Sequence, residues 1–376
     1  MTHSKLISIV LPTYNHLKFL PQAIESILTQ TYPHFELIII NDGSTDGTDQ
    51  FLKKLEGFDE RVQILHQENQ GLPATLNRGF DLAKGEYLTW VSADNYQVPY
   101  FLEALKDALD ANPEVGMAYS AFTYIDKDSK VLGSVLNEGK NFRKFLFSCG
   151  IAAFMYRRTV KEAIGNYDIS LFCAEDWDYW LRLSYEYPLV FVQESLLFYR
   201  VHQNSLTQLK KNTVFEKSLA IFKKYYDKAV NPLDLYFLYP SLKECKDHKE
   251  AIAHALFDFG ASILYVRYAN AALALPFLEA ALEKMPNDAL LLYNMAYAYA
   301  LLKEWEKMRG ILKLLKNGRC PKEVLIFVDK LEEVPNNFNV LEDCLVLKLT
   351  ESSSELLRLE KKHYLTWSYT KNGLKK

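Results

Sequence analysis

Short apolar runs alternate with amphipathic stretches through the first 130 residues. The runs are rich in β-branched residues, as buried strands are, and the stretches between them carry apolar residues at helical spacing. The strand-like runs are residues 7–11, 37–40, 62–65 and 87–91, and the helical stretches are 17–28, 45–55 and 72–83. Strands separated by helices of about ten residues form βαβ units. The pattern therefore predicts an α/β fold with a mainly parallel sheet and helices on both faces.

The regular alternation does not continue beyond this region. We expect a further strand at 152–156, a helix at 175–187 and a strand at 189–199. Residues 210–250 are charged and have helical spacing, which indicates a connector rather than a second sheet.

From about residue 251 the strand signals vanish, and two stretches repeat a pattern roughly 34 residues apart. The first copy runs from Phe259 through Ala274 to Pro286, and the second begins at Tyr293. This resembles the tetratricopeptide repeat, in which small residues let paired helices approach closely. Two copies are fewer than such repeats need, so flanking helices must help to close the core. We therefore predict a catalytic domain at 1–207, a helical connector at 208–250, helical repeats at 251–318 and a helical C-terminal region at 319–376.

The composition excludes several classes of protein. The chain has 376 residues, and its 44 basic and 47 acidic residues leave a formal net charge of −3, which argues against a general nucleic-acid binder. The five cysteines are scattered without a Cys-x-x-Cys pair, so neither a zinc knuckle nor a disulfide framework is indicated. The chain start lacks the apolar stretch of a signal peptide, and no apolar run is long enough to span a bilayer. We expect a cytoplasmic protein, either free or peripheral to the inner face of a membrane.

The last 16 residues hold five lysines and no acidic residue, interleaved with Tyr364, Trp367 and Tyr369. A basic, aromatic tail can contact an anionic membrane surface. The alternative interpretation is a solvated chain end.

Polar clusters follow three of the first four expected strands. In open α/β sheets, ligands bind beyond the carboxyl ends of the strands. Any one cluster could be turn chemistry alone, because Pro, Asn, Asp, Gly and Ser all favour turns. Three clusters at the same sheet edge indicate a ligand site. The clusters are Pro12-Thr13-Tyr14-Asn15, residues 41–47, and Ser92-Ala93-Asp94-Asn95.

These residue types suit a nucleotide accompanied by a metal ion. Asp42 can accept hydrogen bonds from a base or a ribose, and Gly43 lets the backbone approach closely. Asp94 is a candidate metal ligand, because magnesium often takes one or two carboxylates and completes its shell with phosphates and water. Alternatively, Asp94 caps the helix that starts near Pro99. No G-x-G-x-x-G or G-x-x-x-x-G-K-[ST] pattern follows a strand, which argues against a dinucleotide fold and a P-loop.

Six ordered motifs, covering about residues 5–207, resemble those of family 2 glycosyltransferases. They are ISIVLPTYNH at 7–16, ELIIINDGSTDGT at 36–48, ENQGL at 68–72, GEYLTWVSADN at 85–95, AEDWDYWLRL at 174–183 and YRVHQNSLT at 199–207. The resemblance implies a GT-A fold, a nucleotide-sugar donor with UDP as the first candidate nucleotide, and inversion at the anomeric carbon.

The resemblance also implies roles for individual residues. Asp94 matches the metal-binding member of a D-x-D-like motif, with Mg²⁺ or Mn²⁺ as the ion. His202 is a second candidate metal ligand, and a structural histidine is the alternative. Ser92 stands where the first aspartate is usual and Asn95 where a following acid is usual, a departure that concerns metal binding more than nucleotide binding. The residues implied to line the nucleotide pocket are Pro12, Thr13, Tyr14, Asn15, Asp42, Asn69, Gly71, Arg78 and Ala93.

The Glu175-Asp176 pair matches the motif that supplies the catalytic base. An acceptor hydroxyl is a poor nucleophile until its proton is removed, so the reaction needs such a carboxylate. We expect Asp176 to be the base and Glu175 to orient the acceptor. The alternative is a pair of helix N-terminal acids, with Asp178 pairing with Arg182 one turn later. The neighbouring aromatic residues whose faces suit a sugar ring are Trp177 and Trp180.

The leading hypothesis is an inverting, metal-dependent glycosyltransferase that acts on a glycan or lipid-linked acceptor in polysaccharide biosynthesis. The second is a degenerate nucleotide-sugar-binding module whose repeats recruit a protein partner. A nucleotidyltransferase is less favoured, because residues 41–47 contain no Lys or Arg. The helical repeats are expected to provide a surface for protein interaction or self-association.

Overall fold

The computed structural model describes residues 4–135, 142–147, 150–230, 235–265, 271–318, 320–335, 344, 346–348, 353–362 and 365–367. The chain divides into two compact units, Met1–Tyr225 together with Tyr364–Lys376, and Tyr226–His363. Each unit is described by itself below. The basic tail beyond Trp367, for which membrane contact is predicted, lies outside the described residues.

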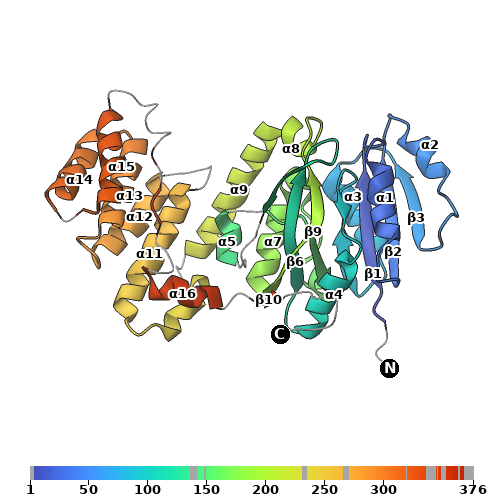
Figure 1. Ribbon diagram of the computed structural model, residues 1–376, viewed down its shortest axis with the longest axis horizontal. Coiled ribbons are helices and arrows are strands. Elements are labelled where there is room, and N and C mark those ends of the chain that lie inside the picture. The colour runs from blue at the N-terminus through green and yellow to red at the C-terminus, as the bar shows by residue number, and fades with distance from the viewer. Residues whose placement is uncertain are drawn as a thin grey trace. The chain divides into compact units, whose positions relative to one another are not determined.

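The first unit is built on one mixed sheet with the strand order β10-β9-β6-β8-β4-β1-β2-β3 (Figure 1). Two short strands pair off this path, β5 with β9 and β7 with β6. The strands are β1 Ile7–Thr13, β2 Phe35–Asp42, β3 Val62–Gln67, β4 Tyr87–Trp90, β5 Tyr96–Gln97, β6 Met117–Ile125, β7 Val131–Val135, β8 Phe154–Arg157, β9 Leu189–Arg200 and β10 Leu365–Trp367. The run β4-β1-β2-β3 is parallel throughout, whereas β8 is antiparallel to both of its neighbours, β4 and β6. The predicted α/β fold with a mainly parallel sheet is confirmed.

Helices cover both faces of this sheet. On one face, Ile9 and Leu11 of β1 share a buried core cluster with residues of α1 and α4. On the other face, α3 packs so closely that a Cβ atom on Gly79 would lie 2.4 Å from Val10 Cγ1. The neighbouring side chains of β1 therefore point to opposite layers, as the period of a strand requires. The helices of this unit are α1 Leu20–Leu28, α2 Thr48–Lys53, α3 Leu72–Leu82, α4 Phe101–Ala111, α5 Phe142–Phe147, α6 Arg158–Ile164, α7 Glu175–Glu186 and α8 Leu206–Leu209, and α9 Lys211–Val230 leads out of it.

The central strand β6 is absent from the sequence-based expectations. Its sequence, MAYSAFTYI, mixes small and aromatic residues and contains no aliphatic β-branched residue before Ile125. Nearly all of it is nevertheless buried, because β6 lies between β8 and β9. A strand buried on both faces shows no alternation of polar and apolar residues.

The second unit is helical. Its helices are α10 Leu235–Leu238, α11 His248–Tyr265, α12 Ala271–Leu282, α13 Ala289–Leu301, α14 Trp305–Asn317, α15 Lys322–Glu333 and α16 Glu355–Lys362. The starts of α12 and α14 are separated by the expected period of roughly 34 residues. The likeness to tetratricopeptide repeats stays a prediction.

A buried amide holds the chain that follows these helices. Asn294, in the middle of α13, is fully buried. Its Nδ2 donates to the carbonyl of Leu347 at 2.5 Å, and its Oδ1 accepts from the Leu347 backbone N–H at 2.9 Å. Next along the chain, Lys348 Nζ lies 3.8 Å from the centre of the Tyr265 ring. Asn294, within the largely apolar α13, thus holds a C-terminal segment against the helices by hydrogen bonds.

Candidate functional site

The polar clusters predicted from the sequence meet at the carboxyl edge of the parallel strands. β1 lies between β2 and β4, and Thr13 at its end is in register with Asn41 of β2. Pro12, Thr13 and Ala93 are buried at this edge, whereas Tyr14 is 47% exposed. Three loops therefore surround one edge of the sheet, and the half-exposed Tyr14 lies at the rim of the site.

Asp42 is the centre of the first group of side chains. Its carboxylate is buried and accepts from Gln67 Nε2 at 2.7 Å, the Gln70 backbone N–H at 2.8 Å and the Gly71 backbone N–H at 3.0 Å. Its carbonyl accepts from Asn69 Nδ2 at 3.0 Å. A carboxylate has about four lone-pair positions. These contacts use three of them and leave one, on Oδ2, for an outside donor.

Arg78 is linked to this carboxylate through Gln67. The guanidinium donates to Gln67 Oε1 at 2.7 Å, and Gln67 in turn donates to Asp42. Gln67 was not predicted as a site residue, although it is the last residue of β3 and shares the edge with Asp42. The structure thus brings Asp42, Asn69, Gly71 and Arg78 together, as the family resemblance implies.

Gly43 allows the loop after β2 to pass close to the loop after β3. Its backbone is left-handed, with φ of 76°, and a Cβ atom there would lie 2.8 Å from the Asn69 backbone nitrogen. A side chain at position 43 would push these two loops apart, so Gly43 is needed for their close approach, and its approach to a nucleotide stays a prediction.

The loop after β1 is fixed by the loop after β2. Asn15 adopts a left-handed conformation with φ of 57°. Its N–H donates to Ser44 Oγ at 3.0 Å and its Oδ1 accepts from the Thr45 N–H at 2.7 Å. One residue pair further on, the Leu17 N–H donates to Asp46 Oδ2 at 2.9 Å. Asn15 is therefore part of the scaffold that fixes the loop after β1 against the loop after β2.

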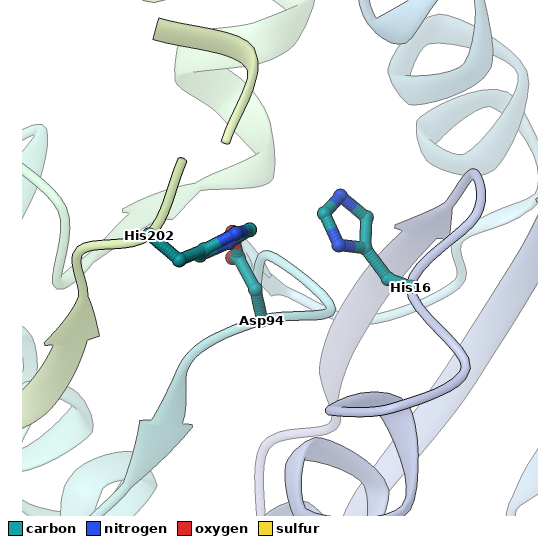
Figure 2. A group of neighbouring side chains, drawn as sticks. All are labelled: His16, Asp94 and His202. Atoms are coloured by element: carbon teal, nitrogen blue, oxygen red, sulfur yellow. The ribbon is translucent and has the colours of Figure 1, made fainter. Parts of the chain in front are cut away.

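Asp94 and His202 form a second group on the same edge (Figure 2). Asp94 Oδ2 lies 3.0 Å from His202 Nε2, and its Oδ1 accepts from Ser92 Oγ at 2.5 Å. Burial acts to raise the pKa of Asp94, but the hydrogen bond with His202 and the nearby His16 outweigh it, and the pKa is lowered. Asp94 is thus a buried, ionised carboxylate. The two candidate metal ligands, Asp94 and His202, thus lie side by side, and Ser92 orients the carboxylate.

His16 joins this group, although it was not predicted as a site residue. One ligand atom each from His16, Asp94 and His202 lie within 4.8 Å of one another. The ring of His16 points toward the other two side chains (Figure 2). Burial lowers the pKa of His16, partly offset by the charge of Asp94. The available signal was its position in the first polar cluster, directly after Asn15.

Arg200 supports the Asp94 loop from behind. The sequence suggests either a phosphate contact or an exposed ion pair for this residue, and its burial contradicts the exposed ion pair. Its side chain is buried, and its Nε donates to the carbonyl of Asp94 at 2.9 Å. Its backbone N–H donates to Asn95 Oδ1 at 2.9 Å. The asparagine in place of the usual acid therefore helps to fix the loop that carries Asp94.

Glu175 and Asp176 open α7. Glu175 is 3% exposed, and its Oε2 has no hydrogen-bond partner among the described residues. Burial, followed by the charge of Asp176, raises its pKa from 4.5 to about 8. Asp176 is less buried and its Oδ1 accepts from the Trp177 N–H at 2.7 Å. The environments of the two adjacent acids thus differ: burial makes Glu175 hold its proton more tightly, whereas Asp176 is less buried and accepts a hydrogen bond.

Asp178 has the structural role that the alternative interpretation gives it. It is buried and pairs with Arg182 Nε at 2.8 Å, one helical turn later. It also accepts from Lys224 Nζ at 3.0 Å and from the Tyr225 hydroxyl at 2.8 Å. These contacts explain Asp178 without a catalytic role.

The expectation that Trp177 and Trp180 present their faces to a sugar is wrong. Trp177 is 4% exposed and Trp180 is fully buried. Trp180 packs edge to face against Phe154 of β8, with ring centres 4.4 Å apart. Trp177 Nε1 donates to the Phe145 carbonyl of α5, so both rings lie in the interior, where their apolar area stabilises the fold.

Replacing Glu175 by Gln is expected to flatten the pH dependence of stability. Because the pKa of Glu175 is raised in the folded protein, the folded state holds its proton more tightly, and the wild type loses stability as pH rises from 4.5 to about 8. Glutamine does not ionise, so the variant should melt at a higher temperature than the wild type at about pH 9 and at no higher temperature at about pH 5. Thermal unfolding across this range measures the effect, with Glu186→Gln at the exposed end of α7 as the control. Parallel curves for the two proteins would contradict the burial argument.

In the described part of the chain, each helix is too short or too polar to cross a bilayer.

Comparisons with known proteins agree with this architecture. The family model described as glycosyl transferase family 2 matches residues 8–160. The chain is 30% identical to EpsH of Bacillus subtilis over 230 residues, 58% of this chain and 67% of EpsH. It is 28% identical over 222 residues to the uncharacterized glycosyltransferase MJ1057 of Methanocaldococcus jannaschii, 56% of this chain and 76% of that protein.

A solved structure, TarS 1–349 of S. aureus, matches with a TM-score of 0.50 and 16% identity, over 83% of this chain and 92% of that chain. At this identity the match shows a shared fold alone. The sheet, the motifs at its edge and these relatives lead to one conclusion. The chain belongs to glycosyltransferase family 2, and its α/β unit has the GT-A type of fold.

Proposed function

We propose that this glycosyltransferase moves a sugar from a nucleotide-diphosphate sugar to an acceptor hydroxyl, with inversion at the anomeric carbon. The observation that carries the proposal is the shared edge of β1, β2 and β4. The Asp42 group and the Asp94–His202 pair both lie there, joined by the loop that contains Asn15 and His16. One side of the edge suits a nucleotide and the other suits its diphosphate.

The geometry of Asp42 favours UDP as the nucleotide. One lone pair of its carboxylate is left over by the internal hydrogen bonds, so it can accept from one outside N–H. The uracil ring has a single imide N–H, which matches a single acceptor; thymine shares this group, so the match favours UDP over GDP, and UDP over dTDP is the expectation from the family resemblance. An acceptor position of a buried carboxylate costs free energy when it has no hydrogen bond, so a donor from the ligand would be favoured there. In our proposal Gly71 holds this carboxylate directly, Arg78 holds it through Gln67, and Asn69 fixes the Asp42 carbonyl.

In the proposed reaction, Asp176 accepts the proton of the acceptor hydroxyl as its oxygen attacks the anomeric carbon. The bond to the diphosphate breaks on the opposite face of the sugar, so the configuration inverts. Glu175, protonated at neutral pH, donates a hydrogen bond that orients the acceptor. A neutral acid beside an ionised one supplies a donor and an acceptor at the same position.

The residues at Asp94 fit a divalent metal ion. A buried, ionised carboxylate and a neighbouring imidazole nitrogen are an accepted ligand pair for such ions. Asp94 and His202 would hold the ion, with Mg²⁺ and Mn²⁺ as the predicted choices. When bound, the ion would neutralise the charge that develops on the leaving diphosphate. The chain's own part is to fix Asp94 through Ser92 and through Arg200 behind it.

A donor panel tests the nucleotide assignment. Calorimetry with UDP-, GDP- and dTDP-sugars should find tightest binding for a UDP-sugar. Asp42→Asn should weaken that binding by about tenfold or more, because loss of one hydrogen bond to a charged group costs about 1.5–3 kcal/mol. Asp81→Asn, which removes an exposed carboxylate from α3, is the matched control. Equal binding of UDP by wild type and Asp42→Asn would contradict the assignment.

The alternative function is a nucleotide-sugar-binding module without catalysis. It predicts binding in the calorimeter and no turnover with any acceptor, and also no hydrolysis of the bound donor. The raised pKa of the buried Glu175, next to a second carboxyl group, favours the enzyme, since perturbed carboxyl groups cluster at catalytic sites.

The acceptor and the cellular setting belong to the proposal as well. We propose a glycan or lipid-linked acceptor, in polysaccharide biosynthesis, and a cytoplasmic enzyme that can contact the inner face of a membrane. The helical unit is proposed to bind a protein partner or a second copy of the chain. Sizing by light scattering over a range of concentrations tests self-association.

A further inference from the structure

His16, Asp94 and His202 bring two imidazoles and one carboxylate within ligand distance of a common point (Figure 2). They come from three separate places in the chain. His16 follows β1, Asp94 follows β4, and His202 follows β9. The family motif accounts for Asp94, and the proposed function adds His202. His16 is additional to both.

The distances agree with one shared ion. Two ligand atoms on the same ion are at most about 4.2 Å apart, twice a metal–nitrogen bond of about 2.1 Å, and adjacent ligands of an octahedron are about 3.0 Å apart. The Asp94 and His202 atoms are 3.0 Å apart, as adjacent ligands would be. All three atoms lie within 4.8 Å of one another, so a movement of the His16 side chain toward the other two would place all three on one ion.

The position of His16 is set before any ion binds. Its neighbour Asn15 is held by Ser44 and Thr45, and the Leu17 N–H is held by Asp46. The carbonyl of His16 also accepts from the Leu20 N–H at 3.0 Å, at the start of α1. With its backbone fixed on both sides, the imidazole has only its own side-chain rotations to lose on binding.

The donor set determines which ions suit this position. Imidazole nitrogen suits first-row transition ions, whereas Mg²⁺ prefers carboxylate, carbonyl and water oxygen. Ser92 stands where the family motif usually has another aspartate, and its hydroxyl is engaged with Asp94. One carboxylate oxygen and two nitrogens are therefore the ligands that the described residues bring together here. That set favours Mn²⁺, Co²⁺ or Zn²⁺ over Mg²⁺.

We propose that His16 is a third protein ligand of the metal and makes the enzyme selective for transition ions over Mg²⁺. This inference rests on the proposed metal site of Asp94 and His202. It also gives the loop after β1 a double role, because Asn15 belongs to the nucleotide side of the edge and His16 to the metal side. Donor and metal then bind to one connected scaffold.

The test measures metal binding by the full-length protein without donor or acceptor. Titration with MnCl₂, followed by the electron paramagnetic resonance signal of free Mn²⁺, gives the affinity, and competition with MgCl₂ gives the selectivity. We expect wild type to bind Mn²⁺ at least about tenfold more tightly than Mg²⁺. His16→Ala should lose at least about tenfold in Mn²⁺ affinity, because loss of even an outer-shell partner lowers metal affinity by about 10–100-fold. Its affinity for Mg²⁺ should change little.

Two variants keep the test decisive. His34→Ala removes an exposed histidine from the same unit and should bind Mn²⁺ like wild type. His16→Glu replaces nitrogen by oxygen at similar reach and should shift selectivity toward Mg²⁺. Melting curves without metal identify any variant that fails to fold, in which case the His16→Glu selectivity decides.

The outcomes separate this inference from the proposed function. If His16→Ala binds Mn²⁺ like wild type while Asp94→Asn does not, the His16 inference is wrong and the site of Asp94 and His202 stands. If wild type binds Mg²⁺ as tightly as Mn²⁺, the selectivity is wrong. If wild type binds neither ion, both metal assignments fail, whereas glycosyl transfer is tested independently by turnover.

Discussion

Asp176→Asn is expected to abolish measurable sugar transfer and to leave the binding of the nucleotide sugar nearly unchanged. The asparagine has the same shape and still accepts from the Trp177 N–H, so α7 should begin as before. It cannot accept the proton of the acceptor hydroxyl. Removing a general base typically costs about 10²–10⁴-fold in rate, and the loss should appear in kcat while the donor affinity stays within about twofold.

The measurement pairs a turnover assay with calorimetry on the same preparation. Glu186→Gln is the matched control, since it removes one carboxylate from the opposite, exposed end of α7 and should transfer sugar like wild type. Full activity in Asp176→Asn would remove this residue from the role of base. Loss of donor binding together with turnover would instead mean that Asp176 holds the donor.

The sheet could be predicted where each strand had a signature of its own. β1 and β2 are continuous β-branched runs followed by polar turns, and helices α1 and α3 lie between the strands with clear amphipathic spacing. β6 could not be found, because a strand buried on both faces has no alternation and its small and aromatic residues are common elsewhere. Its burial is a consequence of tertiary pairing with β8 and β9.

The grouping of site residues could be predicted where their motifs follow neighbouring strands. Asp42, Asn69 and Gly71 come from two motifs that follow neighbouring strands, and the sheet order alone brings them together. Gln67 and His16 were missed because each is defined by what it faces across a loop. The partner of Gln67 is 25 residues distant, and His16 approaches residues after β4 and β9. No local pattern encodes such a pairing.

The aromatic residues show the opposite error. Trp177 and Trp180 were assigned to the sugar because they flank the two acids in sequence. On a helix, however, residues three apart lie on one face. That face is directed into the protein, where Trp180 meets Phe154 and Tyr156. Only the structure distinguishes the helix face that carries Asp176 from the face that packs in the core.

Asp94→Asn should remove metal-dependent turnover even at saturating Mn²⁺. The amide keeps the size of the carboxylate and can still pair with His202 and Ser92, so the loop fixed by Arg200 should remain in place. It lacks the negative charge that makes a buried carboxylate a metal ligand. Because metal stabilisation of a developing charge is worth several kcal/mol and each 1.4 kcal/mol is tenfold, we expect a loss of at least about a hundredfold in kcat/KM. Asp81→Asn is the control for removal of one charge. Wild-type turnover that survives chelation would show that the reaction needs no ion. An Asp94→Asn variant that still needs and binds Mn²⁺ would show that the ion is held elsewhere. A loss confined to the metal-dependent rate would place the ion at the edge shared by β1 and β4.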